Sequence, residues 1–150
     1  MLTKQGTPEN INLDFEEAGQ KLALTLTYLT KKYPTLKAPI VTGYSQGGAM
    51  SFIMAAQYPE AISIALPVSG FLPDAWIPNK APTDAPRIIA FHGTVDQRVP
   101  FEKTNGAITQ LAKIGYSVEM RPYVGVHHTI APKERVDWLN EVQRAVEANF

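Results

Sequence analysis

Val41-Thr42-Gly43-Tyr44-Ser45-Gln46-Gly47-Gly48 is the stretch around which this sequence of 150 residues is organised. It contains the pattern Gly-x-Ser-x-Gly, with a short apolar run before it and helix-compatible residues after it, as far as Tyr58. In a nucleophile elbow, a strand ends in a strained turn that exposes the serine, and a helix begins directly afterwards. Glycines are expected around such a turn because a Cβ there would collide with the neighbouring strand or helix. The context therefore predicts a strand over 39–42, a helix over 46–58 and Ser45 as a nucleophile.

The composition is that of a single globular domain. Hydrophobic residues make up 45% of the sequence and charged residues 19%, which suffices for one hydrophobic core. Fourteen acidic residues balance fourteen basic ones, so neither a nucleic acid nor an anionic membrane is expected as the main partner. The sequence has no cysteine, which excludes disulfides, thiolate metal sites and cysteine nucleophiles, and we predict no metal site. Charged residues interrupt the first thirty positions and no apolar run is long enough to span a membrane, so we expect a cytoplasmic protein.

Apolar periodicity predicts helices and strands in alternation along the chain. Residues 1–11 are read as a polar arm, and a first helix begins near Asn12 or Asp14 and ends before Pro34. The elements expected after the elbow are a strand over 61–68, a loop over 70–86, a strand over 87–92, a helix over 101–114, a strand over 116–124 and a helix from residue 132. This alternation indicates an α/β fold, with a mostly parallel sheet of about four strands and helices on both faces.

Spacings of three and four residues predict which helix faces point inward. The face expected for the first helix consists of Phe15, Ala18, Leu22, Leu26 and Leu29. The face expected for the last helix consists of Val136, Leu139, Val142 and Val146.

Candidate partners for Ser45 follow the later strands. In parallel sheets, sites form at the carboxyl ends of the strands, and Asp96 follows the strand over 87–92. Two adjacent histidines, His127 and His128, follow the strand over 116–124, and one of them is expected to be structural or solvated. The order Ser, Asp, His is that of an α/β hydrolase triad. An imidazole can take the serine proton, an aspartate can orient the imidazole, and the backbone N–H of Gln46 can stabilise an oxyanion.

Other residues have both a structural and a functional interpretation. Asp96 can also be explained as a turn residue, because aspartate is common in turns. His92 ends a strand and is interpreted as a hydrogen-bond donor that braces the next loop. The residues that remain as candidates for lining a substrate site are Leu72, Trp76 and Val99. Leu72 and Trp76 are equally consistent with apolar anchors of the long loop.

Four stretches of the sequence resemble the phospholipase/carboxylesterase group of α/β hydrolases, which includes bacterial carboxylesterases and acyl-protein thioesterases. These stretches are 43–49, 68–70, 92–100 and 123–130, and the resemblance extends from about residue 12 onward. It implies Ser45 as nucleophile, Asp96 as acid and His128 as base. In the family pattern the catalytic histidine lies three residues after a glycine and precedes x-Ile, which selects His128 over His127. The resemblance also implies carboxylic esters or thioesters as substrates and no cofactor.

The sequence departs from the family pattern before the first helix. The resemblance implies earlier strands and a Leu-His-Gly-x-Gly loop that supplies a second oxyanion donor, and no such loop precedes Ser45 in this sequence. We therefore expect a truncated α/β-hydrolase fold in which the strand from Ile40 to Gly43 is an apolar sheet edge. An exposed edge invites pairing with another chain, so we predict a homo-oligomer, unless the arm of residues 1–11 covers it.

These observations support a serine hydrolase of short-chain acyl or aryl esters as the leading hypothesis. Thioesterase or lysophospholipase activity is the enzymatic alternative. A non-catalytic fragment or binding module, with an incomplete oxyanion hole, is the alternative from a different class.

Overall fold

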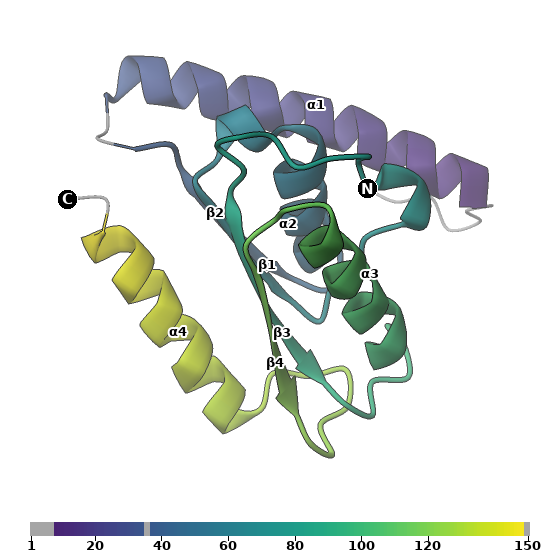
Figure 1. Cartoon of the computed structure of the whole chain (residues 1–150). Helices are drawn as coiled ribbons and strands as arrows, with labels where there is room; N and C mark the ends of the chain where they lie inside the picture. The colour runs from purple at the N-terminus through teal and green to yellow at the C-terminus, as the bar shows by residue number, and fades with distance from the viewer. Residues whose placement is uncertain (1–7, 35–36, 149–150) are drawn as a thin grey trace.

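The computed structural model describes residues 8–34 and 37–148, which form four helices and four strands (Figure 1). The helices are α1 (Pro8–Lys32), α2 (Gln46–Gln57), α3 (Phe101–Lys113) and α4 (Pro132–Glu147). The strands are β1 (Ile40–Tyr44), β2 (Ile64–Val68), β3 (Arg87–Gly93) and β4 (Val118–Tyr123). Two short 3₁₀ helices, η1 (Pro59–Ala61) and η2 (Asp74–Trp76), lie in the connections. The predicted α/β fold is confirmed.

The four strands form one parallel sheet in the order β1-β2-β3-β4. Consecutive strands are neighbours, so each crossover returns the chain to the next position in the sheet. Tyr44 at the end of β1 is in register with Val68 at the end of β2, and Gly93 ends β3 opposite Tyr123 of β4. The carboxyl ends of all four strands therefore lie at one edge of the sheet, which is where parallel sheets place their sites. Within the described residues, β1 has a strand partner on one side only.

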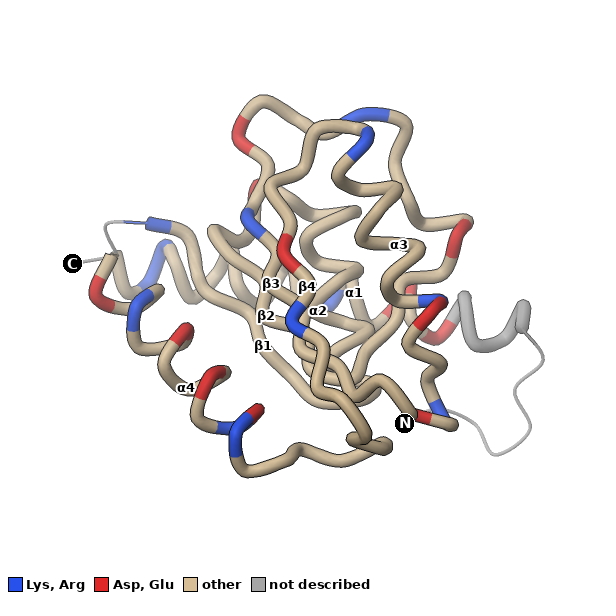
Figure 2. Tube along the Cα trace, turned by 60° about the horizontal axis from the view of Figure 1, so that its bottom comes forward, with Lys and Arg blue, Asp and Glu red and all other residues tan. Residues whose placement is uncertain are grey.

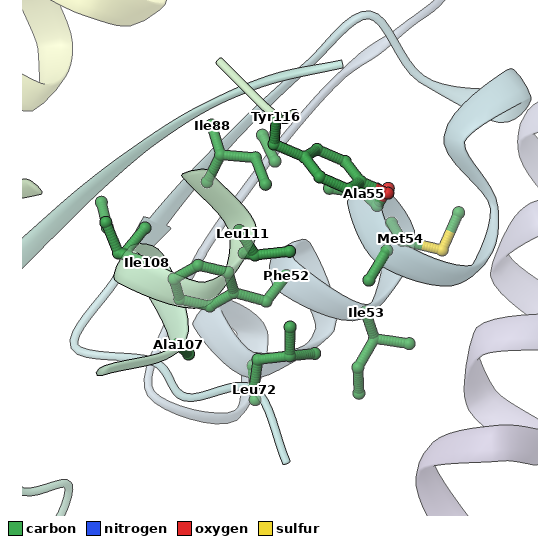
Figure 3. Packing of buried hydrophobic residues seen from close by; sticks show 14 of the residues in the cluster. Phe52, Ile53, Met54, Ala55, Leu72, Ile88, Ala107, Ile108, Leu111 and Tyr116 are labelled. Carbon is green, nitrogen blue, oxygen red and sulfur yellow. The ribbon is translucent and has the colours of Figure 1, made fainter. Parts of the chain in front are cut away.

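Helices cover both faces of the sheet, as predicted (Figure 1). One core lies between the sheet and helices α2 and α3, with α1 packed mainly on α2. Figure 3 shows this core, in which Phe52 of α2 meets Ile108 and Leu111 of α3. A smaller core lies on the other face, where α4 covers buried residues of β2 and β3 such as Leu66 and Phe91. The sheet is thus buried on both sides, which matches the continuous apolar runs of its central strands.

Helix α1 begins earlier than the sequence pattern predicts. It starts at Pro8, so residues 8–11 are helical, and only residues 1–7 of the expected polar arm lie outside the described residues. Proline is favoured in the first turn of a helix because its missing N–H would have no partner there. Strand ends also shift by up to three residues, and η1 occupies the start of the predicted second strand.

The predicted inner face of α4 is correct for Val142 and wrong for its other three residues. Three of its four residues are exposed: Val136 (55%), Leu139 (53%) and Val146 (41%). The side that faces the protein instead contains Trp138 and Val142, together with the buried carboxylates of Glu134 and Glu141. The Glu134 side chain accepts a hydrogen bond from the N–H of Ala131, the residue just before α4, and the Glu141 carboxylate pairs with Arg121 and Arg144. Apolar spacing alone does not reveal such buried carboxylates.

The loop between β2 and β3 is anchored to the helices beneath it. Leu72 is 5% exposed and belongs to the larger core, and Trp76 packs against the same core. The side-chain amide of Gln57 donates a hydrogen bond to the carbonyl of Trp76 at 2.7 Å. These contacts favour the interpretation of Leu72 and Trp76 as loop anchors.

Over the described residues, acidic and basic positions are interspersed, without a broad region of one sign (Figure 2).

Candidate active site

Ser45 sits in the turn between β1 and α2 with a strained backbone. Its φ is 56° and its ψ is −109°, a region that residues with a side chain rarely occupy. The turn is held because the N–H of Ser45 donates to the carbonyl of Val68, and the carbonyl of Ser45 accepts from Ala49, both at 2.9 Å. The first of these bonds ties the turn to β2, and the second starts helix α2. This is the geometry of a nucleophile elbow.

Glycines near the elbow allow backbones to approach closely, although not at every position expected. A Cβ at Gly43 would lie 2.6 Å from the carbonyl carbon of Gly47, and one at Gly48 would lie 2.6 Å from the carbonyl oxygen of Val68. Both distances are shorter than a side chain tolerates, so these two positions require glycine. At Gly47 itself a Cβ would meet nothing within 4 Å. The steric expectation is therefore correct for Gly43 and Gly48 and wrong for Gly47.

The structure brings Ser45, His128 and Asp96 together from three separate loops. His128 Nε2 lies 2.9 Å from Ser45 Oγ, and His128 Nδ1 lies 2.7 Å from Asp96 Oδ2. An ionised carboxylate only accepts hydrogen bonds, so Nδ1 carries the proton and donates it to Asp96. Nε2 is then the acceptor that faces the serine hydroxyl. His127, in contrast, is exposed and has no place in this chain of hydrogen bonds.

Asp96 is fixed by its own loop. Its Oδ1 accepts hydrogen bonds from the backbone N–H groups of Arg98 and Val99, both at 2.9 Å. Burial raises the pKa of Asp96, but the hydrogen bonds from Val99, the His128 ring and Arg98 outweigh it and hold the pKa below its ordinary value. Asp96 is therefore ionised at neutral pH. Its carboxylate orients the imidazole.

His92 braces the loop that carries Asp96, as the sequence interpretation predicts. Its ring is fully buried, and Nε2 donates to the carbonyl of Val99 at 2.8 Å. Burial lowers the pKa of His92, although the Val99 carbonyl partly opposes this effect. The ring is thus neutral and structural. Nε2 also lies 3.5 Å from Asp96 Oδ2, on the side of the carboxylate away from solvent.

The loop that carries His128 is held by contacts that the sequence does not reveal. Tyr44, the residue before the serine, donates its hydroxyl proton to the carbonyl of His128 at 2.8 Å, and the two rings lie 5.1 Å apart. The loop after β3 packs directly on the same segment, since a Cβ at Gly93 would lie 2.2 Å from the carbonyl oxygen of Val126. Val95 donates its N–H to that carbonyl at 3.1 Å. The acid and base loops are therefore locked to each other.

Glu134 lies beneath the loop that carries His128 and is fully buried. Its Oε2 accepts the N–H of Ala131 at 3.1 Å, while Oε1 has no partner among the described residues. Burial raises the pKa of Glu134, partly opposed by the Ala131 N–H, and the nearby charge of Asp96 raises it further. The group starts α4 and so fixes where the loop with His128 ends. The only sequence signal for it is its position two residues after Pro132, where first-turn carboxylates are common.

Two cavities adjoin the elbow. One, of about 430 Å³, is lined by Tyr44, Ser45, Gln97, Arg98, His127 and His128. The other, of about 470 Å³, lies between α1 and the start of α2 and includes Gln46 and Gly47 in its lining. Neither is lined by the predicted residues Leu72, Trp76 or Val99, of which Leu72 and Val99 are 5% and 9% exposed.

Gln46 is the first residue of α2, so its N–H belongs to the helix end whose donors have no acceptor within the helix. That end also carries the positive pole of the helix dipole. It is a suitable donor for a developing oxyanion beside Ser45.

Among the described residues, no group of three His, Asp or Glu side chains is placed to hold a metal ion. No helix in those residues is long and apolar enough to cross a membrane.

Comparison with known proteins identifies the family of this chain. The sequence profile of the Phospholipase/Carboxylesterase family matches residues 4–144. Carboxylesterase SOBER1 of Arabidopsis thaliana is 33% identical over 97 residues, which are 63% of this chain and 42% of that protein. Acyl-protein thioesterase 1 of Gibberella zeae is 32% identical over 109 residues, or 69% of this chain and 45% of that protein. A crystal structure of a SOBER1 variant superposes with a TM-score of 0.76 at 24% identity, covering 88% of this chain and 64% of that one.

The chain belongs to the phospholipase/carboxylesterase family, because the profile match extends over most of its length. The solved structure confirms the α/β-hydrolase fold. This chain spans less than half the length of the curated relatives that it matches.

Proposed function

We propose that this protein is a serine hydrolase of carboxylic esters that acts through a covalent acyl-enzyme. The observation that carries the proposal is the continuous line of hydrogen bonds from Ser45 through His128 to Asp96, with distances of 2.9 and 2.7 Å. A serine on a strained elbow, a neutral imidazole and an ionised carboxylate are the parts that acyl transfer to water needs. Membership of a family with carboxylesterases supports the same reaction.

The proposed reaction has two halves. Ser45 Oγ attacks the ester carbon while its proton moves to His128 Nε2, and the negative charge on the carbonyl oxygen faces the N–H of Gln46. The bond from carbon to the alcohol oxygen then breaks, and His128 returns its proton to that oxygen. Water next attacks the acyl-enzyme, again giving its proton to His128, and the carboxylic acid leaves as Ser45 regains its proton. Asp96 stays ionised throughout and stabilises the imidazolium.

The proposed substrates are short-chain acyl or aryl esters with an uncharged acyl group. The cavities beside the elbow hold about 430 and 470 Å³, enough for small substrates rather than for a long chain. The carboxylates of Asp14 and Glu17 line the cavity beside Gln46, so an anionic acyl group would be repelled there.

Turnover of 4-nitrophenyl acetate tests this proposal. We expect hydrolysis by the wild type and a loss of several orders of magnitude in Ser45→Ala, because the covalent step then has no nucleophile. Ser117→Ala removes an exposed serine hydroxyl and serves as the matched control, with activity like the wild type. Retained activity in Ser45→Ala would mean that another group performs the reaction. No turnover by the wild type would favour a non-catalytic binding module.

Thioester hydrolysis is the second candidate, and the likeness to acyl-protein thioesterase 1 of Gibberella zeae favours it. The same triad serves both reactions, since a thiolate leaves from the same tetrahedral intermediate. Measuring kcat/KM for matched oxygen and sulfur esters of one acyl group separates the two. Lysophospholipase activity is a third arm of that comparison.

We also propose that two copies pair through the free edge of β1, which makes the protein a homo-oligomer. An unpaired parallel strand presents N–H and C=O groups that another chain can bind, and β1 has no second strand partner within the described residues. Light scattering should then give a mass of at least two chains. A monomer in which the backbone amide hydrogens of residues 40–44 exchange slowly would contradict this proposal.

A cytoplasmic location is proposed on composition alone and is tested by cell fractionation.

A further inference from the structure

Arg98 is a cation beside the proposed nucleophile that the mechanism above does not use. It lines the same cavity as Ser45 and His128, together with Gln97 and His127. Its backbone N–H supports Asp96, but its side chain is exposed and has no hydrogen bond or ion pair within residues 8–34 and 37–148. Burial and the charge of Asp96 raise the pKa of Tyr44, whereas the positive charge of Arg98 lowers it. The guanidinium is therefore close enough to act on the Tyr44 hydroxyl.

No carboxylate side chain is among the residues that line this cavity. Asp96 is buried beneath it and already accepts three hydrogen bonds from His128, Arg98 and Val99. The donors that line the cavity without a partner among the described residues are therefore the Arg98 guanidinium, the Gln97 amide and the His127 ring, and of these the guanidinium is the one that is always charged. A guanidinium without a partner is suited to bind a carboxylate or a phosphate through two parallel N–H bonds.

The chemistry of the reaction decides which half of the substrate lies here. His128 must return its proton to the departing alcohol oxygen, so that oxygen lies beside His128 Nε2. His128 lines the cavity with Arg98, whereas Gln46 and Gly47 line the other cavity. The alcohol half of the ester is thus directed toward Arg98, and the acyl half toward α1.

The charges around the second cavity reinforce this assignment. Asp14 and Glu17 line that cavity, and its one cation, Lys21, is already paired with Glu17. Asp14 Oδ2 is buried there without a partner among the described residues. A negative group is thus disfavoured on the acyl side and favoured on the alcohol side.

We propose that the Arg98 side chain and the Gln97 amide form a subsite for one anionic group, a carboxylate or a phosphate, on the alcohol half of the ester. This inference rests on the proposed esterase function and names the class of substrate for that site. The substrates it favours are esters of hydroxy acids or of phosphorylated alcohols with a small uncharged acyl group. Arg98 is a specificity residue here and takes no part in bond making.

Matched acetate esters of phenols test the subsite. The anionic esters are 4-acetoxybenzoate and 4-acetoxyphenyl phosphate, and the neutral ester of nearly the same shape is 4-acetoxybenzamide. The quantity compared is the ratio of kcat/KM for an anionic ester to kcat/KM for the neutral ester. Taking this ratio within each variant cancels any general effect of a substitution on the triad, and the two anionic esters separate carboxylate from phosphate.

We expect Arg98→Gln to lower this ratio about five- to tenfold, since an exposed charge pair is weaker than a buried one. Arg98→Lys keeps the charge but loses the planar fork, so its ratio should fall between those of the wild type and Arg98→Gln. Lys113→Gln removes an equivalent charge at the far end of α3, about 18 Å along the helix from Phe101, and should leave the ratio unchanged.

Four outcomes overturn the inference. An equal loss of both esters in Arg98→Gln assigns Arg98 a purely structural role. An unchanged ratio in Arg98→Gln removes the subsite, while turnover of the neutral ester keeps the proposed function. If the wild type hydrolyses phenyl hemisuccinate faster than phenyl butyrate and Arg98→Gln abolishes this preference, Arg98 contacts the acyl half of the ester. The assignment of the two halves of the ester to the two cavities would then be reversed. If the wild type hydrolyses no ester, the proposed function fails and this inference falls with it.

Discussion

Replacing Asp96 with asparagine changes which nitrogen of His128 carries the proton. The new side chain has one oxygen and one NH₂ group in place of two carboxylate oxygens. With its oxygen at the position of Oδ1, it keeps the two hydrogen bonds from Arg98 and Val99, each 2.9 Å long in the wild type. Its NH₂ group then faces His128 Nδ1, which must become an acceptor. Nε2 consequently carries the proton toward Ser45 and cannot remove the serine proton.

The opposite orientation of the asparagine restores the active tautomer but loses both backbone hydrogen bonds. At about 1 kcal/mol for each bond, this orientation is disfavoured by about 2 kcal/mol, or about 30-fold. That ratio sets the smallest loss expected. Related triads lose about 10⁴-fold in kcat when the tautomer is wrong, and this value sets the largest loss expected. We therefore expect Asp96→Asn to lower kcat for 4-nitrophenyl acetate by between about 30-fold and 10⁴-fold.

Asp84→Asn is the matched control, because Asp84 is an exposed loop carboxylate without a role at the site. Its kcat should equal that of the wild type, and circular dichroism should show both variants folded. A folded Asp96→Asn protein that keeps more than a tenth of the wild-type kcat would refute the assigned tautomer. Asp96 would then not be the residue that sets the protonation of the His128 ring.

Three further predictions concern the supports of the site. Tyr44→Phe removes the hydrogen bond to the His128 carbonyl, so we expect kcat to fall and the free energy of unfolding to drop by about 1 kcal/mol in urea titration. Gly48→Ala places a Cβ 2.6 Å from the Val68 oxygen, and unfolding experiments should give a loss of about 1–3 kcal/mol or more. The pKa of Glu134 is raised above its ordinary value of 4.5, so the stability from this group is full below that value and is lost as pH rises through its folded pKa. Glu134→Gln lacks this loss, and its stability relative to the wild type should increase as the pH rises above 4.5.

Each of these predictions has a control within the chain. Tyr28→Phe removes an exposed hydroxyl, and a loss of kcat equal to that of Tyr44→Phe would speak against a positioning role for Tyr44. Gly47→Ala meets no atom within 4 Å and should stabilise α2 by about 0.5–1 kcal/mol, so a large destabilisation there would contradict the packing described. Glu60→Gln removes an exposed carboxylate and is the control for the effect of the substitution itself. A difference in stability between Glu134→Gln and the wild type that does not change with pH would mean that folding does not raise the pKa of Glu134.

The sequence predicts the elements that its local chemistry determines. Strand, elbow and helix around Ser45 follow from one motif, and the order of Ser45, Asp96 and His128 predicts that they follow successive strands. The structure brings the His128 ring within hydrogen-bond distance of both Ser45 and Asp96. Their catalytic roles stay predictions until activity is measured. The interpretation of His92 is also correct, because a histidine at the end of a buried strand has few other partners than the loop that follows.

What the sequence does not predict depends on contacts between distant residues. The inward face of α4 includes Glu134 and Glu141 because each side chain finds a hydrogen-bond partner inside the protein, and such partners cannot be predicted from apolar spacing. Tyr44 is part of the motif, but its hydrogen bond to the His128 carbonyl joins two residues that lie 84 positions apart in the sequence. In the sequence, Arg98 stands out only as part of a family stretch. Only the folded chain shows that its side chain, in the same cavity as Ser45, has no partner among the described residues.

Labelling with a fluorophosphonate is the sharpest test of Ser45 as the nucleophile, since it requires an activated serine and no knowledge of the substrate. We predict one label for each wild-type chain, located by mass spectrometry on Ser45. We also predict no label in Ser45→Ala and strongly slowed labelling in Asp96→Asn. An unlabelled but folded wild type, or a label that persists in Ser45→Ala, would contradict the assignment of Ser45 as the nucleophile.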